Sequence, residues 1–371
     1  MSCDNSIEKS TDKSYIDFPV KKDTSIHYAK RFSISENEKF KCIYLFGNAD
    51  IKDTTGIYII LKDSTLNLKK AKDEFFFKTS CKKIASLSSV YTNMFCELNA
   101  LQNVSAIENV DYYNNAEVIE KFNNQKLIEL VKGSEIDIEK TIVLNPDIIF
   151  SFGMNGDKNG ENKKIEWANI PTVFCLDHLE ETPLARAEWI KFYAAFVRKE
   201  QLADSIFKMI EKNYLSLETL ASTAKTQPTV FTEIKYGDVW YVPGGKSFVA
   251  TLLKDANANY VFKDDTHTGS LNLSFEEVYT TAKNADYWLN LALVNSKNEL
   301  LSFEPRYAEF NAFKKGNLYN NNKIVNQKGY SNYWETAIIY PDRVLSDLIL
   351  IFHPELNTEI KGELNYYKKI K

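Results

Sequence analysis

Between residues 238 and 257 the chain reads Asp238-Val-Trp-Tyr-Val-Pro-Gly-Gly-Lys-Ser247 and then Phe248-Val-Ala-Thr-Leu-Leu-Lys-Asp-Ala-Asn257. An apolar run over residues 229–234 precedes it and predicts a buried strand. The sequence therefore predicts a strand, an aromatic loop, a Gly-Gly turn and an amphipathic helix that Ser247 can open. In open α/β folds, ligands bind beyond the carboxyl ends of the strands. Three aromatic residues follow this strand and are candidate ligand contacts: Tyr236, Trp240 and Tyr241.

Two other interpretations of this stretch compete with a ligand-binding loop. Gly245-Lys246-Ser247 resembles the end of a phosphate-binding loop, but that motif needs a glycine where this chain has Trp240. The sequence therefore does not predict a nucleotide site. The second alternative stays open: the stretch can be an ordinary strand-to-helix turn whose aromatic side chains are buried in the core.

The composition is that of a globular protein with room for two domains. The chain has 371 residues, of which 44% are apolar and 26% charged. Its formal net charge is -4, and no basic excess favours a nucleic-acid partner. No run approaches the roughly 20 apolar residues that a membrane helix needs.

The five cysteines are scattered and form no C-x-x-C pair, so they predict neither a zinc site nor a redox pair. Cys3 differs from the others because a small residue precedes it and a polar stretch follows it to about residue 24. We expect residues 1–24 to be a disordered tether, with a lipid on Cys3 as in a lipoprotein. An ordinary polar terminus is the alternative explanation.

Histidine is scarce, with four residues spread along the chain. A site for a bare transition-metal ion usually gathers several His, Cys or carboxylate ligands. We therefore expect no metal site and no cofactor held by the protein itself.

The pattern of apolar residues divides the chain into successive parts. Residues 25–80 alternate apolar and polar and predict antiparallel β-structure. From residue 83 strands alternate with helices, which predicts a parallel sheet. A helical segment begins at Pro183, with Thr182 as N-cap, and runs to about residue 222. After Pro228 the β/α pattern resumes and ends in a helix over residues 341–351. The expected domains are 25–181, a bridging helix over 182–198, and 199–371.

One local pattern occurs on both sides of the bridging helix. Asp137-Ile-Glu-Lys and Ser274-Phe-Glu-Glu each place an N-cap residue before a short helix that leads to a strand. Each puts a glutamate, Glu139 or Glu276, in the first turn. Acidic residues there can simply favour the helix dipole. The matching positions also predict that both glutamates lie at corresponding surface sites of two lobes.

From about residue 83 to 355 the chain resembles the class III substrate-binding proteins of ABC importers, which bind ferric siderophores, haem or vitamin B12. The matching segments are residues 84–89, 133–149, 182–198 and 240–247, in the family's order and spacing. Two features depart from the family: Arg198-Lys199 stands where the bridging helix usually ends near a glycine, and residues 25–80 are an addition.

The resemblance implies an α/β fold of two Rossmann-like lobes joined by one long α-helix, here with an extra N-terminal β-rich segment. It implies a monomer in the periplasm or cell envelope, held to the membrane only through its lipid. The partners would be an ABC permease and its ATPase. By motif match, Glu139 and Glu276 would contact the permease, with Glu277 an open alternative to Glu276.

The resemblance also implies a ligand between the lobes, and we expect a metal chelate or macrocycle that aromatic rings can stack on. Arg306 could neutralise an anionic chelate. The predicted ligand-binding residues are Ser88, Tyr91, Tyr112, Tyr113, Phe152, Tyr236, Trp240, Tyr241, Arg306, Tyr333 and Trp334.

Two other functions compete with substrate binding for transport. A hydrolase could use Ser88 or Ser247 with His267, but no G-x-S-x-G elbow is present. A free metal-ion binder of the same fold is disfavoured by the scarcity of histidine.

Overall fold

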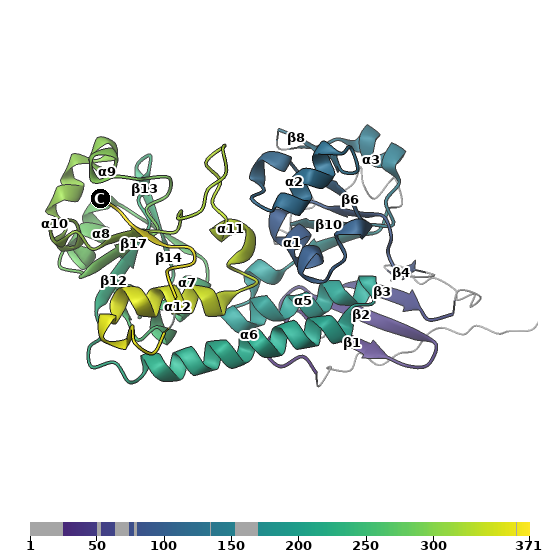
Figure 1. Ribbon diagram of the computed structural model, residues 1–371, viewed down its shortest axis with the longest axis horizontal. Helices are drawn as coiled ribbons and strands as arrows, with labels where there is room; N and C mark the ends of the chain where they lie inside the picture. The colour runs from purple at the N-terminus through teal and green to yellow at the C-terminus, as the bar shows by residue number, and fades with distance from the viewer. Residues whose placement is uncertain are drawn as a thin grey trace, which may run out of the picture.

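The computed structural model describes residues 25–49, 53–63, 74–77, 80–133, 135–152, 170–360 and 362–371. Two α/β lobes stand side by side on a pair of long helices, and a small β-sheet lies beside the N-terminal lobe (Figure 1). The predicted fold class is therefore confirmed. Cys3 and the predicted tether lie outside the described residues.

The N-terminal lobe has a five-stranded parallel sheet in the order β11-β10-β5-β6-β7. Its central strands are almost fully buried, as expected of a sheet covered on both faces. The strands are β5 (Ile84–Ser86), β6 (Val104–Ile107), β7 (Ile128–Glu129), β10 (Ile148–Phe152) and β11 (Thr172–Cys175). The helices are α1 (Ser89–Glu97), α2 (Ala116–Asn123) and α3 (Ile138–Leu144), and β8 (Val131–Lys132) pairs with β9 (Glu135–Ile136).

The C-terminal lobe has a sheet in the order β15-β12-β17-β18-β19, parallel except for β19. Its strands are β12 (Thr229–Thr232), β15 (Asn259–Tyr260), β17 (Tyr287–Leu289), β18 (Leu318–Asn320) and β19 (Lys368–Lys369). Its helices are α7 (Phe248–Asp255), α8 (Phe275–Ala282), α9 (Lys297–Phe303), α10 (Asn311–Lys315), α11 (Tyr333–Thr336) and α12 (Pro341–Phe352).

The predicted aromatic loop after β12 is a strand. Residues Val239–Pro243 form β14, the middle strand of an antiparallel sheet with β13 (Lys235–Tyr236) and β16 (Ser270–Leu273). Side chains alternate across a strand, so Trp240 points into the core and is fully buried, while Tyr241 is 46% exposed. One of its two pairing partners, β13, is adjacent in sequence, whereas the longer pairing is with β16, which is distant in sequence and gives no local signal.

The Gly-Gly turn holds a second loop tightly against the start of α7. The amide of Gly244 donates to the carbonyl of Gly269 (2.8 Å), and that of Lys246 donates to His267 (3.0 Å). A Cβ on Gly244 would overlap the His267 carbonyl oxygen. Ser247 then caps α7 by accepting the amide of Ala250 (3.2 Å), as predicted.

The predicted helical segment is two antiparallel helices, α5 (Pro183–Val197) and α6 (Glu200–Ala221). Thr182 caps α5 as expected, and Arg198 ends it in the left-handed conformation (φ 56°) that glycine usually takes. In Figure 1 the two helices lie side by side beneath the lobes; α5 contacts α1 of the first lobe and α7 and α12 of the second, and α6 also packs on α12. The 22 residues of α6 span about 33 Å at 1.5 Å per residue. The bridge predicted for residues 182–198 is therefore completed by α6.

Contacts along α6 show this bridging role. Near its start, Glu200 pairs with Lys41 of the N-terminal β-sheet. Further along, Asn213 donates to Asp342 of α12 (3.1 Å), and Tyr214 donates to Asp255 of α7 (2.6 Å). One continuous helix thus contacts both halves of the molecule.

The N-terminal segment is an integral layer of the first lobe. Its sheet runs β1 (Phe32–Glu36), β2 (Phe40–Phe46), β3 (Thr54–Leu61) and β4 (Glu74–Phe77), antiparallel as predicted except that β4 is parallel to β3. Buried Glu188 of α5 accepts the amides of Tyr28 (2.8 Å) and Ala29 (2.9 Å). This contact fixes the chain on α5 just before β1 begins. Within the described residues, no helix has the length and apolar character needed to cross a bilayer.

The Gly-Gly turn gives a stability prediction. Gly244→Ala should destabilise the protein by about 1–3 kcal/mol, because the added methyl group must displace the backbone of the 263–269 loop. Urea denaturation followed by circular dichroism measures the change. Gly269→Ala is the matched control, since a Cβ there meets no described atom within 4 Å. Equal stability of the two variants would refute the close approach.

Candidate functional site

The carboxyl ends of the N-terminal sheet carry three of the predicted site residues. Ser88 is the N-cap of α1, directly after β5, and is partly exposed. Tyr112 follows β6 and is 37% exposed, and Phe152 ends β10 with 49% exposure. This edge is where open α/β sheets bind ligands.

The second lobe contributes three further exposed aromatic residues. Tyr236 in β13 is 83% exposed, Tyr241 in β14 is 46% exposed, and Trp334 in α11 is 63% exposed. A ligand that covers large exposed aromatic side chains removes apolar surface from water, which stabilises the complex. Of the nine aromatic residues predicted to contact the ligand, these three and the two in the first lobe have side chains exposed enough for a ligand to contact.

The other four predicted aromatic contacts are core residues in this structure. Tyr91 stacks on Tyr193 of α5, and Tyr113 and Tyr333 are at most 6% exposed. Trp240 is completely buried against Trp288, and its indole nitrogen donates to the carbonyl of Thr232 (3.2 Å). The expectation that Trp240 touches the ligand is therefore wrong for this structure, because strand alternation turns the ring into the core.

Arg306 is also placed differently from the prediction. Its guanidinium bonds Glu304 twice (2.9 and 2.8 Å) and Glu276 once (2.9 Å), and lies 3.9 Å above the ring of Phe275. These contacts fix Arg306 on α8, where it pairs with a predicted docking glutamate. Its acidic partners already supply the negative charge that an anionic chelate was expected to bring.

The two lobes contact through a buried carboxylate that the sequence did not single out. Glu335 of α11 is 1% exposed and accepts the side-chain amide of Asn93 (2.9 Å). It also accepts the backbone amides of Asn114 (2.8 Å) and Asn115 (3.2 Å), at the start of α2. A carboxylate that accepts several N–H groups makes a strong, geometrically specific contact.

Residues around Glu335 extend this contact, and we call residues 323–337 the interlobe segment. Asn326 donates its side-chain amide to the carbonyls of Asp111 (2.8 Å) and Tyr113 (3.0 Å). Tyr330 packs edge-on against the exposed Tyr112, with ring centroids 4.8 Å apart. The interlobe segment therefore brings the second lobe against the loop that follows β6, next to a predicted ligand contact.

Arg186 is the cation that the structure brings to the junction of the lobes. It is the one residue of α5 that is not buried. Its guanidinium donates to the carbonyls of His178 (2.6 Å) and Glu180 (3.1 Å) and lies 4.3 Å above Phe248 of α7. Sequence reasoning missed it because its position in a helix gives no signal of its surroundings.

Beside Arg186, two titratable groups follow β11: Asp177, which is buried, and His178, which is partly buried. Burial raises the pKa of Asp177 to about 6, although the Arg186 guanidinium lowers it. Burial lowers the pKa of His178 to about 4, so its ring is neutral at physiological pH. That ring stacks on Phe152 with centroids 4.1 Å apart. Within the described residues, Asp177 Oδ1 and His178 Nδ1 have no hydrogen-bond partner.

The geometry does not assemble the alternatives of a hydrolase or a metal centre. Ser247 caps α7, and His267 pairs with Asp265 (3.0 Å) on an exposed loop. In the part of the chain that the structure describes, no group of three His, Cys, Asp or Glu side chains could hold a metal ion.

Comparison with known proteins gives the family. The family model described as "Periplasmic binding protein" matches residues 84–324, which is more than half of the chain. The chain belongs to the periplasmic binding protein family. Proteins of this family bind substrates for transport and are not enzymes, which removes the hydrolase alternative.

Curated relatives of this periplasmic binding protein come from Methanocaldococcus jannaschii. One uncharacterized lipoprotein is 32% identical over 234 residues, covering 62% of this chain and 53% of the relative. The chain thus spans about half the length of that relative. A second uncharacterized lipoprotein is 26% identical over 349 residues, covering 88% of this chain and 83% of the relative.

Solved structures share the fold. A periplasmic heme-binding protein from Pseudomonas aeruginosa aligns with a TM-score of 0.59 at 14% identity, covering 78% of this chain and 98% of that one. A possible iron-binding periplasmic solute-binding protein from Staphylococcus epidermidis aligns with a TM-score of 0.57 at 16% identity, covering 74% and 100%. An ABC-type Fe3+-hydroxamate transport protein from Saccharomonospora viridis gives 0.56 at 15% identity, covering 75% and 95%.

In this periplasmic binding protein the two predicted docking glutamates are exposed. Glu139 lies in the first turn of α3, which Asp137 caps, and Glu276 lies in the first turn of α8. Glu277 instead closes the predicted capping box by accepting the amide of Ser274 (2.7 Å). Both carboxylates therefore have a partner within the chain, Arg306 for Glu276 and Ser274 for Glu277.

Trp240 and Trp334 form a matched pair for a stability prediction. Trp240→Ala should cost about 3–5 kcal/mol, because it opens a cavity in the aromatic core of the second lobe. Trp334→Ala should change stability by about 0.5 kcal/mol or less, since the ring is mostly exposed. Chemical denaturation of both variants checks this, and similar losses in the two would contradict the assignment.

Glu108, at the end of β6, gives a pH prediction. Burial raises its pKa from 4.5 to about 8, although the Tyr113 hydroxyl donates to it (2.8 Å). The folded state therefore binds a proton that the unfolded state releases, so stability should fall as the pH rises from about 5 to about 8. Glu108→Gln should flatten this decline in denaturation curves measured across that range. A decline of equal size in both proteins would contradict the role of Glu108.

Proposed function

We propose that this periplasmic binding protein is the substrate-binding lipoprotein of an ABC importer, and that it captures an iron chelate or a corrinoid between its lobes. The supporting observation is the set of exposed aromatic side chains on the two lobes, two of which, Tyr112 and Trp334, lie beside the interlobe contact of Glu335. Flat or ring-rich ligands bury such side chains over a large area. The ligand would be a siderophore chelate, haem or a cobalamin-like macrocycle.

A chelate fits the site better than a bare ion. The described residues offer no cluster of metal ligands, so the metal would arrive already coordinated. The protein would then need no cofactor of its own. Structural neighbours named as heme-binding and as Fe3+-hydroxamate transport proteins agree with this ligand class.

Arg186 is proposed as the cation that meets an anionic group of the ligand. Its hydrogen bonds go to carbonyl oxygens, whereas the guanidinium of Arg306 is bonded to two carboxylates. The carboxylates of Asp177 and Glu180 interact with the charge of Arg186 without occupying its hydrogen bonds. Guanidinium groups suit carboxylate and other planar anionic groups. In this proposal Phe152 and Trp334 provide stacking surfaces from the two lobes.

The membrane attachment and the partners complete the proposal. Relatives named as lipoproteins support a lipid on Cys3 and a cell-envelope location. The protein would act as a monomer that delivers its ligand to a permease and ATPase complex. Glu139 and Glu276 would pair with basic residues of that permease, which fixes orientation more than affinity.

A ligand panel tests the proposal. Purified protein is dialysed against haemin, a ferric trihydroxamate, a ferric triscatecholate, cobalamin, and free divalent metal ions. One chelate or macrocycle class should bind with a dissociation constant of about 1 μM or tighter. Phe152→Ala and Trp334→Ala should each weaken it about tenfold through lost stacking and burial. Leu215→Ala, exposed on α6, is the control. Binding of free ions alone would refute the proposal.

A further inference from the structure

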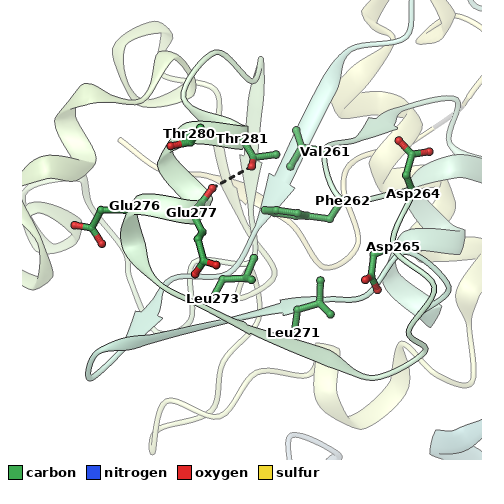
Figure 2. A pocket seen from close by; sticks show the side chains of 10 residues that line it. All are labelled: Val261, Phe262, Asp264, Asp265, Leu271, Leu273, Glu276, Glu277, Thr280 and Thr281. Atoms are coloured by element: carbon green, nitrogen blue, oxygen red, sulfur yellow. Dashed lines mark hydrogen bonds between the residues drawn. The ribbon is translucent and has the colours of Figure 1, made fainter.

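A hollow of about 670 Å³ opens on the second lobe beside Glu276 (Figure 2). We call it the acidic hollow. It lies between α8, β16 and the segment that follows β15. Its lining residues are Val261, Phe262, Asp264, Asp265, Leu271, Leu273, Glu276, Glu277, Thr280 and Thr281.

The acidic hollow combines an apolar floor with an acidic rim. Phe262, Leu271 and Leu273 pack partly on the aromatic core of the lobe and keep exposed surface inside the hollow. Four of its ten lining residues are carboxylates, and none is basic. Glu277 accepts the amide of Ser274, and Glu276 pairs with Arg306, whose cation offsets part of the negative charge at that end of the rim.

We propose that the acidic hollow receives a segment of the permease that presents an apolar side chain flanked by basic side chains. The apolar side chain would cover Phe262 and Leu273, and the basic ones would meet Asp264 and Glu276. Charge complementarity supports this occupant, and so does the position of the hollow, because Glu276 lines it and is also the proposed docking residue. This inference rests on the proposed function.

The corresponding surface of the first lobe differs. A hollow of about 530 Å³ beside Glu139 is lined by Ile128, Val143 and Leu144, and its charged residues are Lys83, Glu139 and Lys140. It too offers an apolar floor, but its charge is mixed rather than acidic. The two lobes therefore present different surfaces to the permease, and a strongly basic segment fits the second lobe alone.

The test uses the full-length protein and its permease and ATPase complex in lipid nanodiscs. Asp264→Lys should weaken association with the complex about tenfold at low salt, with a smaller loss at high salt. Leu273→Ala should weaken it about threefold to tenfold at both salt concentrations, because its contribution is apolar. Glu359→Lys is the matched control, since it makes the same charge change at another exposed site of the second lobe. The double variant Glu139→Lys with Glu276→Lys should no longer stimulate the ATPase activity of the complex, and it serves as the reference for complete loss of docking.

Each result decides a separate point. Equal association of Asp264→Lys and Glu359→Lys, with ligand binding intact, would overturn the acidic hollow as a docking surface and leave ligand capture standing. A change in the sedimentation of the isolated protein on Asp264→Lys would overturn it in favour of a second copy of this chain. Failure of the unmodified protein to bind any ligand of the panel would overturn the proposed function and the docking inference with it.

Discussion

The burial of α5 is the constraint on which the rest of the structure depends. Fourteen of its fifteen residues are buried, so every face of the helix must be covered. Phe196 is covered from both sides. The centroid of its ring lies 5.1 Å from that of Phe150 in the lobe sheet and 5.7 Å from that of Tyr58 in the N-terminal sheet. The N-terminal β-rich segment therefore supplies a missing layer. Without it, one aromatic face of α5 would meet water, and the first lobe would lose part of its core.

The same helix sets the geometry of the site. Because α5 is locked between two sheets, its single unburied residue, Arg186, is held at the junction of the lobes. Buried Glu180 accepts the amides of Lys30 (3.0 Å) and Arg31 (2.9 Å), so the turn before α5 is fixed to the N-terminal segment as well. The packing of α5 and of the turn before it on the N-terminal segment thus positions Arg186 at the junction of the lobes.

Local signals predicted much of this fold. The β-structure predicted for residues 25–80 is present and includes β2 (Phe40–Phe46). The caps of α5, α7 and α8 lie where Thr182, Ser247 and Ser274 indicated, because capping depends on neighbouring residues. Non-local pairing could not be predicted. The strand character of β14 and the burial of Trp240 depend on β16, and Glu335 meets Asn93 across 242 residues. The exposed aromatic residues were found by their place after strands, whereas Arg186 became visible only through its surroundings.

The contact between the lobes suits a binding protein that moves little. Three hydrogen bonds reach Glu335, and each contributes about 1.5–3 kcal/mol when one partner is charged. Separating the lobes would return the carboxylate and two backbone amides to water, which offsets part of that loss. The interlobe segment can therefore release without unfolding either lobe. In contrast, α6 contacts both lobes along its length, so separation must bend or shift a continuous helix. Resistance to separation of the lobes is therefore greater along α6 than at the interlobe segment.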